Sequence, residues 1–202
     1  MNGSKQLGRQ GSIWLMVAAL LVALPAVAVA QSGAQVLEDE SKAAAALVQQ
    51  VRAATARFQE LDAAQAAGYA LLHGCVSGPD HGAMGVHFVN GDLVGDGQVD
   101  AAHPEALIYE FKKGAPTLVG VEFVVLADQW NAAHAAPPVL GGQLFTYNTA
   151  PNRYGIPAFY ALHVWAYREN PDGVFADWNR NVTCSGFTGG TPGADDLASH
   201  GS

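Results

Sequence analysis

The chain has 202 residues, with 18 acidic and 10 basic side chains, and half of its residues are hydrophobic. This length and composition predict one domain with a sizeable core. The formal net charge of −8 argues against nucleic acid and anionic membrane surfaces as partners, because both repel an acidic protein.

The first thirty residues have the pattern of a secretory signal peptide. Lys5 and Arg9 precede an apolar run over 13–30 that ends Ala-Val-Ala. An uncleaved membrane anchor is the alternative, but Pro25 and the small residues at the end of the run favour cleavage after Ala30. Cleavage removes two positive charges and changes the net charge from −8 to −10. We therefore expect a periplasmic or secreted protein with no stable membrane anchor after cleavage.

The segment 35–72 is rich in alanine and predicts one long helix, or a helix and a shorter second one. Its apolar residues recur at spacings of three and four, which place them on one helix face: Leu47, Val51, Ala54, Phe58 and Leu61. Gly68 is a candidate stop, or a break between two helices. We expect this helical block to cover a sheet.

Four later segments have the β-branched and aromatic content of strands. They cover 86–89, 105–111, 118–126 and 159–167. Helices followed by strands in hairpin-like succession predict an α+β domain over 31–184, with the N-terminal helix, or two, packed on an antiparallel β-sheet. Residues 185–202 are rich in Gly, Ser and Asp and predict a disordered tail.

The segment 92–100 has aspartates at its first, fifth and ninth positions and glycine at its sixth, like part of a calcium loop. However, Val94 occupies the position of the second ligand, and His103 stands where a bidentate Glu belongs. An Asp-Gly turn is therefore the preferred interpretation.

Cys75 and Cys184 are the two cysteines of the chain. In an exported protein they predict a structural disulfide. A thiolate metal ligand or a nucleophilic cysteine is the alternative, but neither residue lies in a Cys-x-x-Cys motif.

Glu122 is a carboxylate in the middle of the apolar run 118–126. A buried carboxylate is costly unless it is paired, hydrogen-bonded or bound to a metal. Gly120 lies on the same face of the predicted strand, where its missing side chain would leave room for a ligand.

Each of the four predicted strands carries one His or Glu among apolar neighbours: His87, Glu110, Glu122 and His163. If their faces coincide, two imidazoles and two carboxylates meet in a pocket. These groups are ligands of zinc, copper, iron and manganese, so we predict a site for a divalent metal ion or a small polar ligand. They also suit a general acid and base.

The alternative belongs to another class: a structural or interaction domain in which the same residues form an internal hydrogen-bond network. A weaker metal candidate is the glycine-rich loop around Cys75, which carries His73 and His81. No nucleophile elbow, phosphate loop or dinucleotide fingerprint is present, so the residues assign no reaction or organic cofactor.

Several short segments occur in a distinctive order: 56–60 with 66–69, 82–90, 104–110, 119–123, 162–165 and 177–179. Together they resemble a group of uncharacterised exported bacterial proteins. The resemblance covers roughly 53–184, which is most of the mature chain, and implies a location in the bacterial envelope or outside the cell. It implies no activity, and no residue acquires a catalytic role from it.

Overall fold

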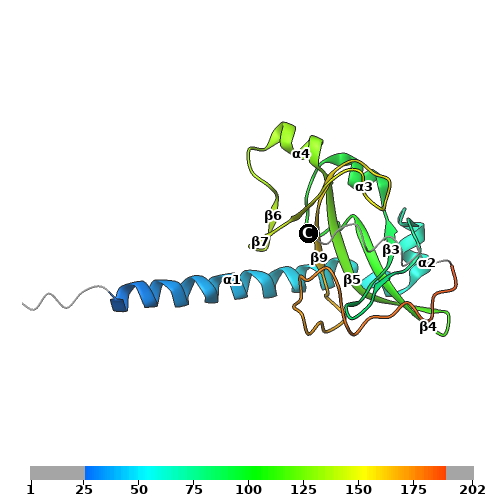
Figure 1. Cartoon of the computed structure of the whole chain (residues 1–202), viewed down its shortest axis with the longest axis horizontal. Coiled ribbons are helices and arrows are strands. Elements are labelled where there is room, and N and C mark those ends of the chain that lie inside the picture. The colour runs from blue at the N-terminus through cyan, green and yellow to red at the C-terminus, as the bar shows by residue number, and fades with distance from the viewer. Residues whose placement is uncertain (1–25, 190–202) are drawn as a thin grey trace, which may run out of the picture. The chain divides into compact units, whose positions relative to one another are not determined.

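The computed structural model describes residues 26–189, and their side chains from residue 33 onward (Figure 1). The predicted signal peptide at 1–30 and the predicted tail at 185–202 therefore lie largely outside the described residues. Two compact units, Met1–Val36 and Leu37–Ser202, share the helix α1 (Ala26–Thr55). Among the described helices, none has the length and hydropathy needed to span a bilayer.

The predicted helical block forms in three pieces. Helix α1 continues into a 3-10 turn, η1 (Ala56–Gln59), and a short helix, α2 (Leu61–Ala66). Glu60 interrupts the helical path because its backbone is extended. Gly68 follows α2 with φ at +93°, a conformation that glycine adopts without strain, so the predicted stop is confirmed.

The second unit contains a seven-stranded sheet in which every pairing is antiparallel. Its strands are β1 (Ala70–Leu71), β2 (Val76–Gly78), β3 (Gly82–Val89), β4 (Ala106–Lys112), β5 (Ala115–Leu126), β8 (Thr146–Asn148) and β9 (Phe159–Val164). The order across the sheet is β1-β3-β4-β5-β9-β8, and β2 also pairs with β3. This architecture confirms the predicted α+β class.

The remaining described elements are short: α3 (Gly91–Asp96), α4 (Ala127–Ala133), and the hairpin of β6 (Val139–Leu140) and β7 (Gln143–Leu144). Helices α3 and α4 lie at the end of the sheet where β5 runs into α4 (Figure 1). The aspartate-rich segment forms α3 and the turn after it. Asp96 accepts a hydrogen bond from the backbone N–H of Gln98, which agrees with the predicted Asp-Gly turn.

Alternation along the strands divides their side chains between two faces. One face packs against α1, η1 and α2 in the main core, which includes Leu47, Val51, Phe58, Phe88, Leu107, Tyr109, Val121 and Phe123. Hydrogen bonds fix the helical layer on this face. The Tyr109 hydroxyl donates to the Phe58 carbonyl at 2.6 Å, and Arg52 donates to the Ala166 carbonyl at 2.6 Å.

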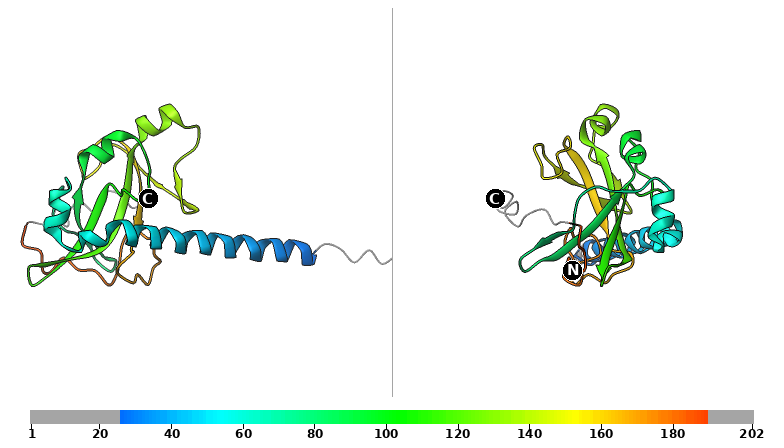
Figure 2. Two further views of the ribbon diagram at one scale, coloured as in Figure 1. Left: turned by 180° about the vertical axis from the view of Figure 1, so that it is seen from behind. Right: turned by 90° about the vertical axis from the view of Figure 1, so that its right-hand side faces the viewer.

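Two bulges bend the sheet. Met84 is the extra residue of β3 opposite β2, and Val119 is the extra residue of β5 opposite β4. A bulge bends its strand and increases the local twist. In the right-hand view of Figure 2, the strands at the two sides of the sheet accordingly cross at a large angle.

Glu105, just before β4, has a buried carboxyl group. Its Oε2 accepts a hydrogen bond from the backbone N–H of Val124 at 2.9 Å. Burial raises the pKa of Glu105 to about 8, although the hydrogen bond from Val124 by itself lowers this pKa. Glu105 is therefore mostly protonated at neutral pH.

Cys75 and Cys184 form a disulfide across a sequence separation of 109 residues, so the predicted pairing is confirmed. The bond ties the loop before β2 to the segment that follows the last strand.

Replacing both cysteines by serine should lower the free energy of unfolding by about 4 to 5 kcal/mol, because the unfolded chain loses a large covalent loop. Urea unfolding of the oxidised protein and of the double variant measures this difference. Alkylation followed by mass measurement tests the bond itself, and two freely alkylated thiols in the unreduced protein would contradict it.

Glu105→Gln should flatten the dependence of stability on pH. The folded state keeps a proton on Glu105 up to a pKa of about 8, whereas the unfolded state releases it near 4.5. The contribution of Glu105 to the free energy of unfolding is therefore fully present below pH 4.5 and is lost as the pH rises through 8. Gln keeps an acceptor for Val124 and cannot ionise. As the pH rises from 5 to 9, the free energy of unfolding of the variant should therefore increase by a few kcal/mol relative to that of the wild type. Parallel curves of unfolding free energy against pH would refute this assignment.

Candidate metal centre

Three of the four predicted site residues meet on the face of the sheet opposite the helices. His87, Glu122 and His163 each offer one ligand atom, and these atoms all lie within 4.8 Å of one another. Their sequence neighbours Phe88, Phe123 and other members of the main core point to the opposite face. The face that carries the group is therefore distinct from the face that the helices cover.

The strand register brings the three residues together. Glu122 on β5 and His163 on β9 are direct cross-strand partners. His87 lies on β3, beyond the intervening strand β4, and the residue of β4 opposite Glu122 is Ala106. Because Ala106 has only a methyl group, it leaves space over β4 in which Glu122 and His87 approach each other.

The two imidazole rings meet above the strands that separate them. Strands β3 and β9 lie three places apart in the sheet, which is about 14 Å in a flat sheet. The Nε2 atoms of His87 and His163 are nevertheless 3.4 Å apart, so both side chains reach over β4 and β5. The bulges in β3 and β5 bend these strands locally.

Gly120 permits the close approach of β9 and does not provide the ligand space that we expected from the sequence. A Cβ atom at Gly120 would lie 2.8 Å from the carbonyl oxygen of Val164 and 3.3 Å from Trp165. The backbone of β9 occupies the space that a side chain at Gly120 would need. The prediction that Gly120 leaves room for a ligand was therefore wrong.

The distances within the group match ligands around an ion better than hydrogen-bonded pairs. His87 Nε2 lies 3.4 Å from both Glu122 Oε2 and His163 Nε2, and the other ring nitrogen of His163, Nδ1, lies 3.7 Å from Glu122 Oε1. Direct hydrogen bonds between such groups are usually about 2.7 to 3.2 Å long. Two ligand atoms that are each about 2.1 Å from one ion at a tetrahedral angle lie about 3.4 Å apart.

The buried ring of His163 has an unsatisfied nitrogen. Its Nδ1 has no hydrogen-bond partner among the described residues, and the residue is only 2 % exposed. The nearest carboxylate oxygen is Asp177 Oδ1, at 3.6 Å. If Nε2 of His163 binds an ion, Nδ1–H faces Asp177, which is how carboxylates orient metal-binding histidines.

The charge states of the group favour a cation between its members. Burial, together with the neighbouring His163, lowers the pKa of His87 to about 3, so His87 is the neutral imidazole that metals bind. Burial also opposes charge on His163, but the carboxylates of Glu122 and Asp177 raise its pKa overall. Burial raises the pKa of Glu122, because its carboxylate lies in an apolar sheet. A bound cation would supply the positive charge that this carboxylate lacks.

Glu110, the fourth predicted ligand, does not belong to the group. It is fully buried, and its oxygens accept hydrogen bonds from Arg168 Nη2 at 2.7 Å and from the backbone N–H of Thr183 at 3.2 Å. Glu122 is opposite Ala106, so Glu110 is four residues farther along β4, a displacement of about 13 Å. Glu110 is therefore not placed to share an ion with the two histidines.

The weaker candidates, His73 and His81, also lie outside the group. His73 Nε2 is 3.2 Å from the carbonyl oxygen of Tyr154, and the ring of His81 lies beside Trp178. Within residues 33–189, His87, Glu122 and His163 form the one cluster of three or more potential metal ligands.

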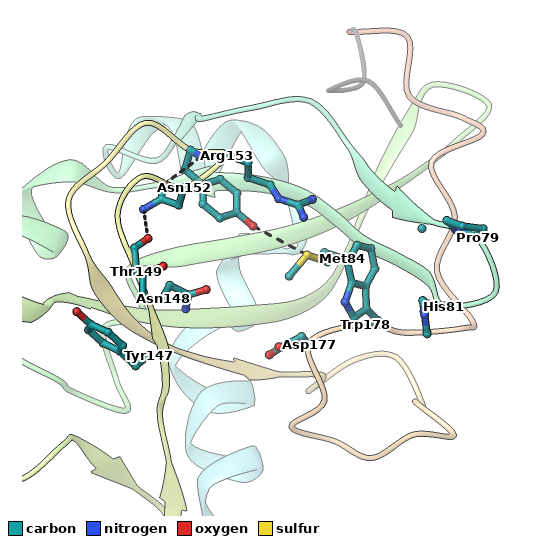
Figure 3. Close-up of a pocket in the computed structure, with 12 residues that line it drawn as sticks. Pro79, His81, Met84, Tyr147, Asn148, Thr149, Asn152, Arg153, Asp177 and Trp178 are labelled. Carbon is teal, nitrogen blue, oxygen red and sulfur yellow. Dashed lines mark hydrogen bonds between the residues drawn. The ribbon is translucent and has the colours of Figure 1, made fainter. Parts of the chain in front are cut away.

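Two cavities adjoin the group. The larger has a volume of about 600 Å³ and is lined by Asp177, Arg153 and Trp178, among others, but by none of the three ligands (Figure 3). The smaller has a volume of about 220 Å³, and both His87 and Glu122 line it. The smaller cavity is therefore the one that reaches the candidate metal centre.

Sequence reasoning did not identify Asp177 or Tyr154 as part of the site. Tyr154 lines both cavities and comes from an irregular segment, and Asp177 lies in a loop after β9. Neither residue lies in a regular strand, so alternation could not assign it to a face. The one available signal was the position of Asp177 in a segment that contributes to the resemblance noted above.

Comparison of the chain with protein-family models, with curated proteins and with solved structures finds no match.

Proposed function

We propose that this is an exported protein that binds one divalent metal ion through His87, Glu122 and His163. The observation that carries the proposal is that three neighbouring side chains each offer one ligand atom and that these atoms lie within 4.8 Å of one another, as ligands of a shared ion do. Two imidazoles and one carboxylate form a donor set that zinc takes in hydrolytic enzymes. Copper, iron and manganese accept the same kinds of donor.

Three protein ligands leave a coordination position open. Structural zinc sites are usually closed by four protein ligands, whereas sites that act on a ligand keep a position for water or substrate. A bound ion would there act as a Lewis acid or lower the pKa of a bound water. The proposed role is therefore a metal centre that receives a small ligand.

Two features support export. The N-terminal residues have the charge and hydropathy pattern of a signal peptide. The Cys75–Cys184 disulfide is of a kind that persists in oxidising compartments. We therefore propose a periplasmic or secreted location, in agreement with the resemblance to exported bacterial proteins.

The competing function is a structural domain in which the same residues form an internal network. The contact between the Nε2 atoms of His87 and His163 favours this alternative. However, a closed network should satisfy its buried members, and His163 Nδ1 has no partner among the described residues. An ion bound to Nε2 of His163 would account for the contact with His87 and would leave Nδ1–H directed toward Asp177 Oδ1, 3.6 Å away.

Metal content tests the proposal. Protein purified without a histidine tag should contain about one metal ion per chain, or should gain thermal stability from added zinc. At a zinc concentration 100 times the dissociation constant, the gain is about 2.7 kcal/mol, which corresponds to a rise of about 5 to 10 °C in melting temperature. Glu122→Gln and His163→Asn should abolish this rise.

Glu110→Gln is the matched control, because it also replaces a buried carboxylate in a neighbouring strand. It removes the ion pair with Arg168 and should lower stability, yet it should leave the zinc-induced rise unchanged. A wild-type protein that carries no metal and does not respond to zinc, copper, iron, manganese or calcium would favour the internal network.

A further inference from the structure

The smaller cavity beside the candidate metal centre is apolar over most of its wall. Aliphatic and aromatic side chains line it, among them Val76, Val89, Val124, Ile156 and Phe159. The polar side chains of its lining are those of His73, His87, Glu122 and Tyr154. Such a cavity favours a ligand whose body is apolar.

The exposed edge of the metal centre faces this cavity. The side chains of His87 and Glu122 are 11 % and 13 % exposed, whereas that of His163 is 2 % exposed and does not line the cavity. The open coordination position of a bound ion would therefore be directed into the apolar cavity, on the side of His87 and Glu122.

The charge at this position selects the head group of the ligand. A divalent ion with two neutral imidazoles and one carboxylate carries a net charge of about +1. In an apolar cavity this charge attracts an anionic group strongly, because the local dielectric is low. Without the ion, the Glu122 carboxylate would repel the same group.

The volume limits the size of the apolar body. A cavity of about 150 Å³ holds benzene, so by proportion about 220 Å³ holds roughly eight or nine carbon atoms. We propose that this cavity binds the apolar tail of a small monoanionic amphiphile, of the class of medium-chain or aryl carboxylates, whose head group coordinates the metal ion. The inference rests on the proposed metal centre and adds the class of its ligand.

Cobalt-loaded protein and a series of alkyl hydroxamates test this inference. Hydroxamates bind metals through their head group, and the visible spectrum of Co²⁺ reports their coordination. From the acetyl to the tetradecanoyl compound, each added methylene should tighten binding about fourfold until the tail reaches roughly eight or nine carbons. Longer tails should then give no further gain.

A variant with a larger side chain in the cavity provides a second test of this inference. Val124→Phe places a ring in the cavity without changing a ligand, so it should reduce the affinity for octanoyl hydroxamate at least tenfold and leave that for acetohydroxamate within about twofold. Val139→Phe, on the exposed hairpin strand β6, is the control and should change neither affinity.

The outcomes separate the two proposals. A protein without any Co²⁺ spectrum would overturn the metal centre and this inference together. A Co²⁺ spectrum that responds equally to all tail lengths would overturn this inference alone. If Val124→Phe does not fold, the series on the wild-type protein still decides the matter.

Discussion

The carboxylate of Glu122 lies inside an apolar sheet, between two imidazoles, and this placement imposes the main constraint on the site. A carboxylate in such surroundings must be protonated, paired or bound to a cation. His87 is neutral because burial lowers its pKa, so it cannot pair with Glu122 as a cation. His163 is buried and has a nitrogen without a hydrogen-bond partner among the described residues. A bound metal ion would give one ligand atom of each of these three side chains a partner.

The fold is organised so that this arrangement can form on rigid elements. One face of the sheet carries the main core beneath the helical layer, which leaves the other face available for the site. The bulges at Met84 and Val119 bend their strands, and Gly120 permits the close approach of β9. Each ligand thus comes from a strand whose position is set by packing on the opposite face, and sites built on strands are held more precisely than sites on loops.

Local patterns predicted much of the site and of the fold. The apolar run around Glu122 and the strand-like neighbours of His87 and His163 identified all three residues, because alternation along a strand is a local property. The helical block and the disulfide also followed from local composition and from cysteine count. The position of Glu110 could not be predicted, because it depends on the register between β4 and β5, which the bulge at Val119 shifts. The role of Gly120 depends on Val164 at the end of β9, which is 164 − 120 = 44 positions away in the sequence. Asp177 comes from a loop after β9, for which no periodic pattern exists.

The most direct measurement is anomalous diffraction at the zinc edge from crystals of the zinc-loaded protein. The account predicts one strong peak about 2.0 to 2.2 Å from Nε2 of His87, from a ring nitrogen of His163 and from a carboxylate oxygen of Glu122. A peak at another site, such as the loop that carries His73 and His81, with none between these three residues, would contradict it.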